Sequence, residues 1–98
     1  MKREEALQRI RAGQSKLGAF PIKHLAVFGS VARNEAGEGS DVDILVEFEP
    51  EAPVGLFEFA RLRRILGELL GCEVDLATPD ALRQEMRAQI LQEAVYAA

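Results

Sequence analysis

Short apolar runs alternate along the chain with longer stretches in which apolar residues recur at helical spacing. The short runs predict strands, at about residues 23–28, 42–48 and 73–77. The helical spacing predicts helices, at about residues 3–16, 55–70 and 79–96, with a short helix starting at residue 30. This order of elements predicts an α/β fold of the α+β type, with a small mixed sheet of three to four strands and helices packed mainly on one face.

The last predicted helix has recognisable start signals. Thr78 is suited to cap it and Pro79 to occupy its first position. Its inward-facing residues are expected to be Leu82, Met86, Ile90 and Leu91. Near its free end, Val95 and Tyr96 belong either to the core or a frayed end, or to an interface with a partner.

The composition is that of one globular domain covering residues 1–98. Of these residues, 48% are hydrophobic and 29% are charged, which are ordinary proportions for a chain that buries a modest core. We expect a cytoplasmic location without membrane contact, because no apolar run suits a membrane span, no signal peptide is evident and the single Cys72 allows no internal disulfide. The net charge of −4 argues against direct binding to nucleic acid.

Two aspartates stand two positions apart at the start of the second apolar run. Asp41 and Asp43 alternate with apolar residues, so in a strand both carboxylates share one face. They then lie about 6–7 Å apart, from twice the rise per residue. At an effective dielectric near 20, their repulsion is roughly 2–3 kcal/mol. A bound Mg²⁺ would turn this repulsion into attraction, whereas the alternative is a solvated strand end with two surface charges.

A Gly-Ser turn follows the first apolar run. Gly29 lets the backbone turn sharply and approach a ligand closely. Ser30 can cap the next short helix, and it can also offer its hydroxyl to a phosphate oxygen. An ordinary helix cap is the alternative, because the chain has neither a Gly-Lys-Ser/Thr phosphate loop nor the glycine pattern of dinucleotide-binding proteins.

A third aspartate lies in the third apolar run. Val74 and Leu76 would share one face of a strand, and Asp75 would lie on the other. Because aspartate is disfavoured in strands, its position calls for a reason. Asp75 is either a third carboxylate that ligates a metal or helps to deprotonate a hydroxyl, or part of an exposed strand face.

Together these residues resemble the DNA polymerase β-type nucleotidyltransferase superfamily. The matching pattern is Gly29-Ser30, ten residues and then Asp41-Val42-Asp43, with Arg33 and Ser40 between. The small size, and Val74-Asp75-Leu76 leading to Thr78-Pro79, are similar to the minimal nucleotidyltransferases (MNT), known as antitoxin partners of HEPN-domain proteins. The resemblance covers about residues 20–96 and implies a polymerase β-like fold.

The resemblance also implies an activity and a site. The enzyme would transfer a nucleotide, AMP from ATP, to an acceptor hydroxyl. Asp41, Asp43 and Asp75 would be catalytic and would hold two Mg²⁺ ions. The residues that would bind the nucleotide are Gly29, Ser30, Arg33 and Ser40. For Arg33, an ordinary surface position on the short helix is the alternative.

The resemblance implies a protein acceptor as well. This acceptor would be a tyrosine of a HEPN toxin, with the present chain as its antitoxin. Two other functions stay open, namely an antitoxin that covers a HEPN partner with little or no catalysis, and a nucleotidyltransferase acting on a small molecule. The complete set of three aspartates favours an enzyme over a binding module. Self-association is also left open.

The chain departs from the family pattern at Asn34, where such sequences often have glycine. Asparagine tolerates the left-handed backbone conformation better than most residues. The turn is therefore predicted to be kept. The loop that follows, residues 34–40, carries two glycines and two glutamates of its own.

Overall fold

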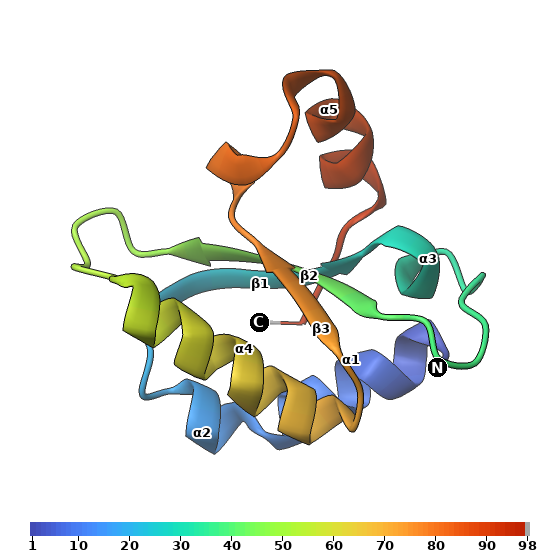
Figure 1. Cartoon of the computed structure of the whole chain (residues 1–98), viewed down its shortest axis with the longest axis horizontal. Helices are drawn as coiled ribbons and strands as arrows, with labels where there is room; N and C mark the ends of the chain where they lie inside the picture. The colour runs from blue at the N-terminus through green and yellow to red at the C-terminus, as the bar shows by residue number, and fades with distance from the viewer. Residues whose placement is uncertain (98) are drawn as a thin grey trace.

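A four-stranded mixed sheet forms the centre of the computed structural model, which describes residues 1–97 (Figure 1). Its strands are β1 (Ile22–Phe28), β2 (Val42–Phe48), β3 (Val74–Ala77) and β4 (Val95–Tyr96), in the order β3-β2-β1-β4. β1 runs antiparallel to both of its neighbours, whereas β2 and β3 are parallel. The predicted mixed sheet is confirmed.

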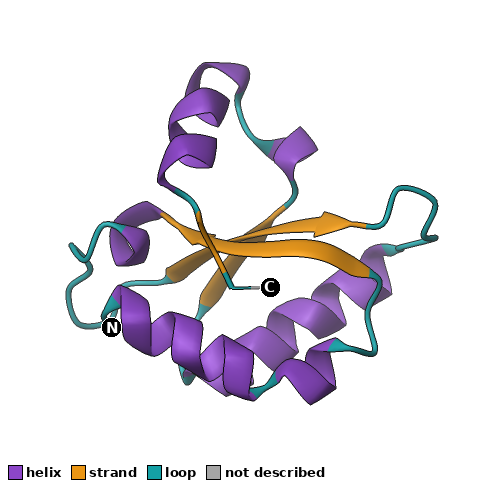
Figure 2. Cartoon of the chain, turned by 180° about the vertical axis from the view of Figure 1, so that it is seen from behind, coloured by secondary structure: helices purple, strands orange, loops and turns teal. Residues whose placement is uncertain are grey.

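One face of the sheet carries the main core. The helices that cover it are α1 (Arg3–Ala12), α2 (Gln14–Leu17) and α4 (Leu56–Leu70), as Figures 1 and 2 show. Alternate strand residues such as Val27 and Ile44 point into this core, where they meet Leu62 and Leu66 of α4. All four of these side chains are fully buried. The prediction that helices pack mainly on one face is therefore confirmed.

The opposite face carries much less apolar cover. Helix α5 (Gln84–Glu93) stands above it, and a smaller buried cluster links this helix to the sheet (Figure 1). The cluster consists of Ala26, Phe28, Leu45 and Ile90. Charged strand residues such as Asp43 and Asp75 can point from this face without entering the main core. Within residues 1–97, no helix combines the length and the apolar character needed to cross a bilayer.

The first predicted helix is divided by Gly13. Helix α1 ends at Ala12 and α2 begins at Gln14, so the expectation of one helix over residues 3–16 is wrong. A Cβ at Gly13 would overlap the side chain of Leu69 in α4. Glycine is a weak helix former, and here its missing side chain admits the neighbouring helix.

The prediction of one helix over residues 79–96 is also wrong, because this segment forms a short 3₁₀ helix, a longer helix and a strand. Pro79 opens a short 3₁₀ helix, η1 (Pro79–Ala81), and Thr78 makes no capping hydrogen bond through its side chain. Leu82 and Arg83 are extended before α5 begins. After α5 the chain forms β4, because the edge of β1 offers hydrogen bonds to an extended segment.

Burial along α5 differs from the prediction as well. Ile90 is buried and Leu82 is partly buried, as expected for inward-facing residues. Met86 and Leu91, however, are 47% and 42% exposed, because the cluster beneath α5 is too small to cover them. Tyr96 in β4 is exposed on the sheet edge, where its ring packs edge-on against His24.

Candidate active site

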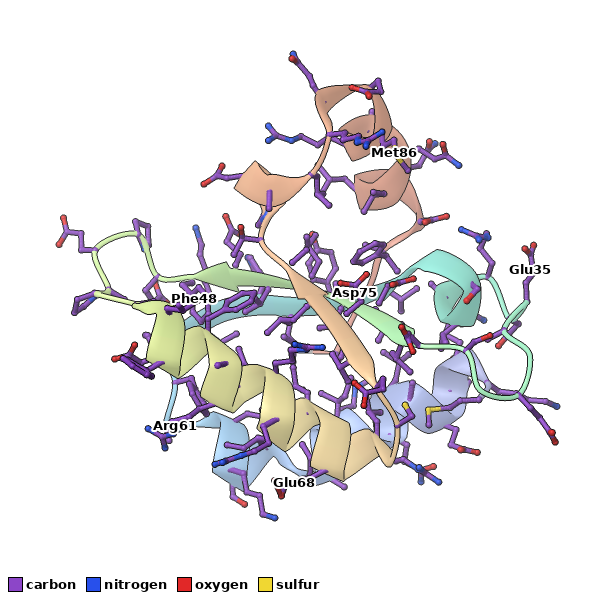
Figure 3. All side chains as sticks on the ribbon, in the orientation of Figure 1. Glu35, Phe48, Arg61, Glu68, Asp75 and Met86 are labelled. Carbon is purple, nitrogen blue, oxygen red and sulfur yellow. The ribbon has the colours of Figure 1, made fainter. Side chains whose placement is uncertain are left out.

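Two of the three predicted aspartates are direct neighbours across parallel strands. Asp43 of β2 is in register with Asp75 of β3, and Figure 3 shows Asp75 where β3 passes β2. Because Val42 and Ile44 point into the main core, Asp43 points to the opposite face, and the same alternation places Asp75 there. Asp41 immediately precedes β2. The fold thus brings carboxylates from two distant segments to one end of the sheet.

Asp43 lies in the least solvated position of the three. Asp43 is half-buried, while Asp41 and Asp75 are exposed. Burial raises the pKa of the Asp43 carboxyl, and the negative charges of Asp75 and Asp41 raise it further. A hydrogen bond with Asp75 acts in the same direction, and the charge of Arg33 opposes them. The site therefore favours a proton or a cation at this carboxylate.

The Gly29 turn lies directly against this carboxylate. Phe28, the last residue of β1, is in register with Asp43, so Gly29 begins the next turn beside it. Gly29 has a φ of +73°, a conformation that favours glycine. A Cβ at this position would overlap Oδ2 of Asp43. Both the backbone conformation and the close approach thus require glycine.

Ser30 differs in one respect from the prediction. Helix α3 (Gly29–Ala32) starts one residue earlier than expected, so Ser30 lies inside its first turn and does not cap it. The reason is that the left-handed Gly29 starts the helix itself, with its carbonyl accepting the Arg33 N–H at 3.2 Å. Ser30 is half-buried at this turn and remains a candidate for phosphate binding.

Arg33 and Glu93 lie beside the Gly29 turn, and Glu93 is a residue that the sequence pattern did not indicate. The carboxylate of Glu93, at the end of α5, accepts the Gly29 N–H at 3.2 Å and an Nη1–H of Arg33 at 3.0 Å. The Nε–H of Arg33 is donated to Glu35 at 3.2 Å. These hydrogen bonds, that with Glu93 first, raise the pKa of Arg33. No local signal could reveal Glu93, since it lies 64 residues from Gly29.

The loop between α3 and β2 is anchored at Asn34. Its φ of +58° confirms the predicted left-handed conformation. Its side-chain oxygen accepts the backbone N–H of Arg3 at 2.8 Å, which ties the loop to the start of α1. Ser40 lies in the exposed part of this loop, immediately before Asp41. Its backbone N–H is donated to Gly37 at 3.3 Å.

The donor set fits a hard cation shared with a phosphate. Among residues 1–97, no group of three or more His, Cys, Asp or Glu side chains is arranged as a complete metal site. Mg²⁺, however, is usually bound by one or two carboxylates together with substrate phosphates. The adjacent pair Asp43 and Asp75 supplies oxygen ligands of this kind, and burial together with the negative charge of Asp75 raises the pKa of Asp43.

Comparison with known proteins identifies the family. Residues 7–97 match the model of the nucleotidyltransferase domain. The chain belongs to this family. The protein adenylyltransferase MntA of Thermococcus cleftensis is 46% identical over 77 residues, which are 79% of this chain and 76% of the relative. The resemblance inferred from the motif is thereby confirmed, and the chain is a nucleotidyltransferase.

Solved structures agree with this assignment. A minimal nucleotidyltransferase superposes with a TM-score of 0.79 at 40% identity, covering 97% of this chain and 95% of that one. A toxin–antitoxin complex with AMP-PNP gives a TM-score of 0.68 at 16% identity, covering 100% of this chain and 73% of that one. The second match supports the nucleotidyltransferase fold alone. The predicted fold class is confirmed by both.

The contact between Gly29 and Asp43 can be tested by a pair of alanine substitutions. Gly39 has a φ of +79°, but a Cβ there would meet no atom within 4 Å, whereas at Gly29 a Cβ would overlap the Asp43 carboxylate. We expect G39A to cost about 1–2 kcal/mol of unfolding free energy, the penalty for a left-handed alanine. G29A should cost at least about 1 kcal/mol more, because the carboxylate must also move. Urea unfolding measures both, and equal losses would contradict the described contact.

The raised pKa of Asp43 predicts a pH-dependent effect of D43N. Because the folded state holds the proton more tightly than the unfolded state, folding loses stability as pH rises through the raised pKa. In metal-free buffer at pH 7, we expect D43N to be more stable than the wild type by about 0.2–1 kcal/mol, the scale of cross-strand charge pairs. The extra stability of D43N should vanish below pH 3.8, the ordinary pKa of an aspartate, because Asp43 is then protonated in both states.

The matched control for this measurement is D80N, because Asp80 is an exposed aspartate in η1. D80N removes one exposed carboxylate and leaves the Asp43 and Asp75 pair intact, so it measures the general effect of losing one negative charge. Thermal unfolding between pH 3 and pH 8 gives both comparisons. If D43N is less stable than the wild type at neutral pH, the charge of Asp43 does not destabilise the folded state and the prediction is wrong.

Proposed function

We propose that the chain is a magnesium-dependent protein adenylyltransferase. It transfers AMP from ATP to a tyrosine hydroxyl of a HEPN-domain toxin and thereby acts as the antitoxin of that protein. The observation that carries the proposal is the placement of Asp43 and Asp75 in register beside the Gly29 turn. The 46% identity to a protein adenylyltransferase MntA supports a protein as the acceptor and adenylate as the transferred group.

The three aspartates would hold the metal ions. Asp43 and Asp75 supply adjacent carboxylates, and Asp41 adds a third negative charge close enough to raise the pKa of Asp43. When bound, two Mg²⁺ ions would supply Lewis acidity that neutralises the negative charge developing on the phosphate oxygens. In return, the cations would relieve the repulsion among the carboxylates.

The turn that contains Gly29 and Ser30 would bind the β- and γ-phosphates. Backbone N–H groups at such a turn point outward and donate to anionic oxygens. Arg33 would add charge-assisted hydrogen bonds, because its guanidinium lies close enough to share Glu93 with the Gly29 N–H. Ser40, in the exposed loop immediately before Asp41, would contribute its hydroxyl.

The reaction joins the tyrosine oxygen to the α-phosphorus of ATP. The bond between this phosphorus and the oxygen that leads to the β-phosphorus breaks, and pyrophosphate leaves with that electron pair. The proton of the tyrosine hydroxyl passes to the carboxylate of Asp75. Asp75 suits this role because it is exposed and lies on β3, the edge strand of the sheet, where a large acceptor can approach.

The proposal predicts the behaviour of the aspartate variants. Purified protein is incubated with Mg²⁺, ATP labelled at the α-phosphate and a HEPN-domain protein from the same organism. We expect label on a HEPN tyrosine, located by mass spectrometry. D41N, D43N and D75N should each lower the rate by at least about a hundredfold, because each removes a ligand for the metal.

D80N is again the matched control and should transfer AMP at the wild-type rate. The folded state of each variant is checked by circular dichroism. A HEPN protein that stays unlabelled by this chain, while a related pair reacts in the same assay, would refute the proposed acceptor. Full activity in any of the three aspartate variants, or in the presence of a chelator, would refute the proposed metal site.

A further inference from the structure

Glu93 holds a position that an anionic ligand would be expected to take. Its side chain is only 17% exposed, although it belongs to the last turn of a surface helix. One carboxylate oxygen accepts the Gly29 N–H and the other accepts an N–H of Arg33. A single side chain from α5 therefore joins the turn after β1 to the guanidinium at the end of α3.

These two donors are the ones that the proposed function assigns to the triphosphate. The Gly29 N–H can make one good hydrogen bond, so a phosphate oxygen and Glu93 cannot both accept it. A phosphate at this position would also place its negative charge against the carboxylate of Glu93. Since the side chain is largely shielded from water, that repulsion would be weakly screened.

We propose that Glu93 occupies the place of a triphosphate oxygen in the nucleotide-free chain, and that nucleotide binding displaces it and releases the C-terminal end of α5. This inference rests on the proposed function, because it requires a triphosphate at the Gly29 turn. Glu93 is then a residue that sets nucleotide affinity by competition. It also couples the state of the nucleotide site to the position of α5.

The packing of α5 makes such a displacement inexpensive. Ile90 is its one buried residue, whereas Met86 and Leu91 are nearly half exposed. The strand that follows pairs with β1 at two positions, Ala26 with Tyr96 and Val27 with Val95. A segment with few buried apolar contacts opens at low free-energy cost. β4 itself is held more firmly, because Val95 and Ala97 pack against the main core and the Ala97 N–H is donated to Leu25 at 2.8 Å. Loss of the Glu93 contacts would therefore loosen the last turn of α5 and leave β4 and the main core in place.

The test compares E93Q with E85Q and the wild type. Glu85 is an exposed glutamate in the first turn of the same helix, so E85Q changes net charge equally and leaves the Gly29 turn untouched. Calorimetry measures the affinity for Mg·ATP, and for tripolyphosphate without metal as a probe of the turn alone. We expect E93Q to bind both about threefold to tenfold more tightly, as the loss of a competing charged hydrogen bond allows. E85Q should bind like the wild type.

Hydrogen exchange provides a second readout that does not depend on affinity. In the wild type, amides of residues 90–94, the last turn of α5 and its C-cap, should exchange faster after Mg·ATP is added. In E93Q they should exchange at the faster rate before any nucleotide is present. A purely structural role for Glu93 would instead weaken binding in E93Q, because a disordered turn holds phosphate poorly.

The outcomes separate this inference from the proposed function. If E93Q binds both ligands no more tightly than the wild type, while the wild type transfers AMP, the displacement of Glu93 is wrong and the enzyme assignment stands. If neither protein binds Mg·ATP or tripolyphosphate, both are wrong, since the Gly29 turn then holds no phosphate.

Discussion

The register between the parallel strands β2 and β3 is the constraint on which the site depends. It places Asp43 directly beside Asp75, although 31 residues and a complete helix separate them in the chain. Side chains alternate along a strand, so a slip of one residue would move either carboxylate into the main core. The two aspartates therefore stay adjacent only while Val42, Ile44, Val74 and Leu76 remain buried on the other face.

Because of this register, the two faces of the sheet differ in character. The face under α1, α2 and α4 is apolar and fixes the strands, whereas the opposite face has a small apolar cluster and can carry charge. Carboxylates that repel one another are a cost to a folded protein, and here the main core on the far side of the sheet offsets it. The same arrangement is what a cation and a triphosphate require. The proposed binding of a cation and a triphosphate would relieve this repulsion, in a chain that belongs to the nucleotidyltransferase family.

Sequence patterns could predict the strands of the main core and the residues at their ends, because alternation and glycine punctuation are local signals. The left-handed turn at Asn34 was also predictable from the tolerance of asparagine for that conformation. Gly13 is a local signal that weakens the first helix, but the close approach of Leu69 from a distant helix, which a Cβ at Gly13 would overlap, was not predictable. The conversion of the last helix into η1, α5 and β4 depends on the free edge of β1, and the role of Glu93 depends on a contact across the whole fold. Such long-range contacts leave no periodicity in one sequence.

The most direct test of the central claim is to locate the cation itself. Mn²⁺ added in small amounts to ¹⁵N-labelled protein broadens the amide signals nearest to its binding site. Binding by the Asp43 and Asp75 pair predicts that the amides of Gly29, Asp43 and Asp75 lose intensity first and together. Broadening centred on the exposed acidic residues Glu47, Glu49 and Glu51, or spread evenly over the surface, would contradict a cation site at this end of the sheet.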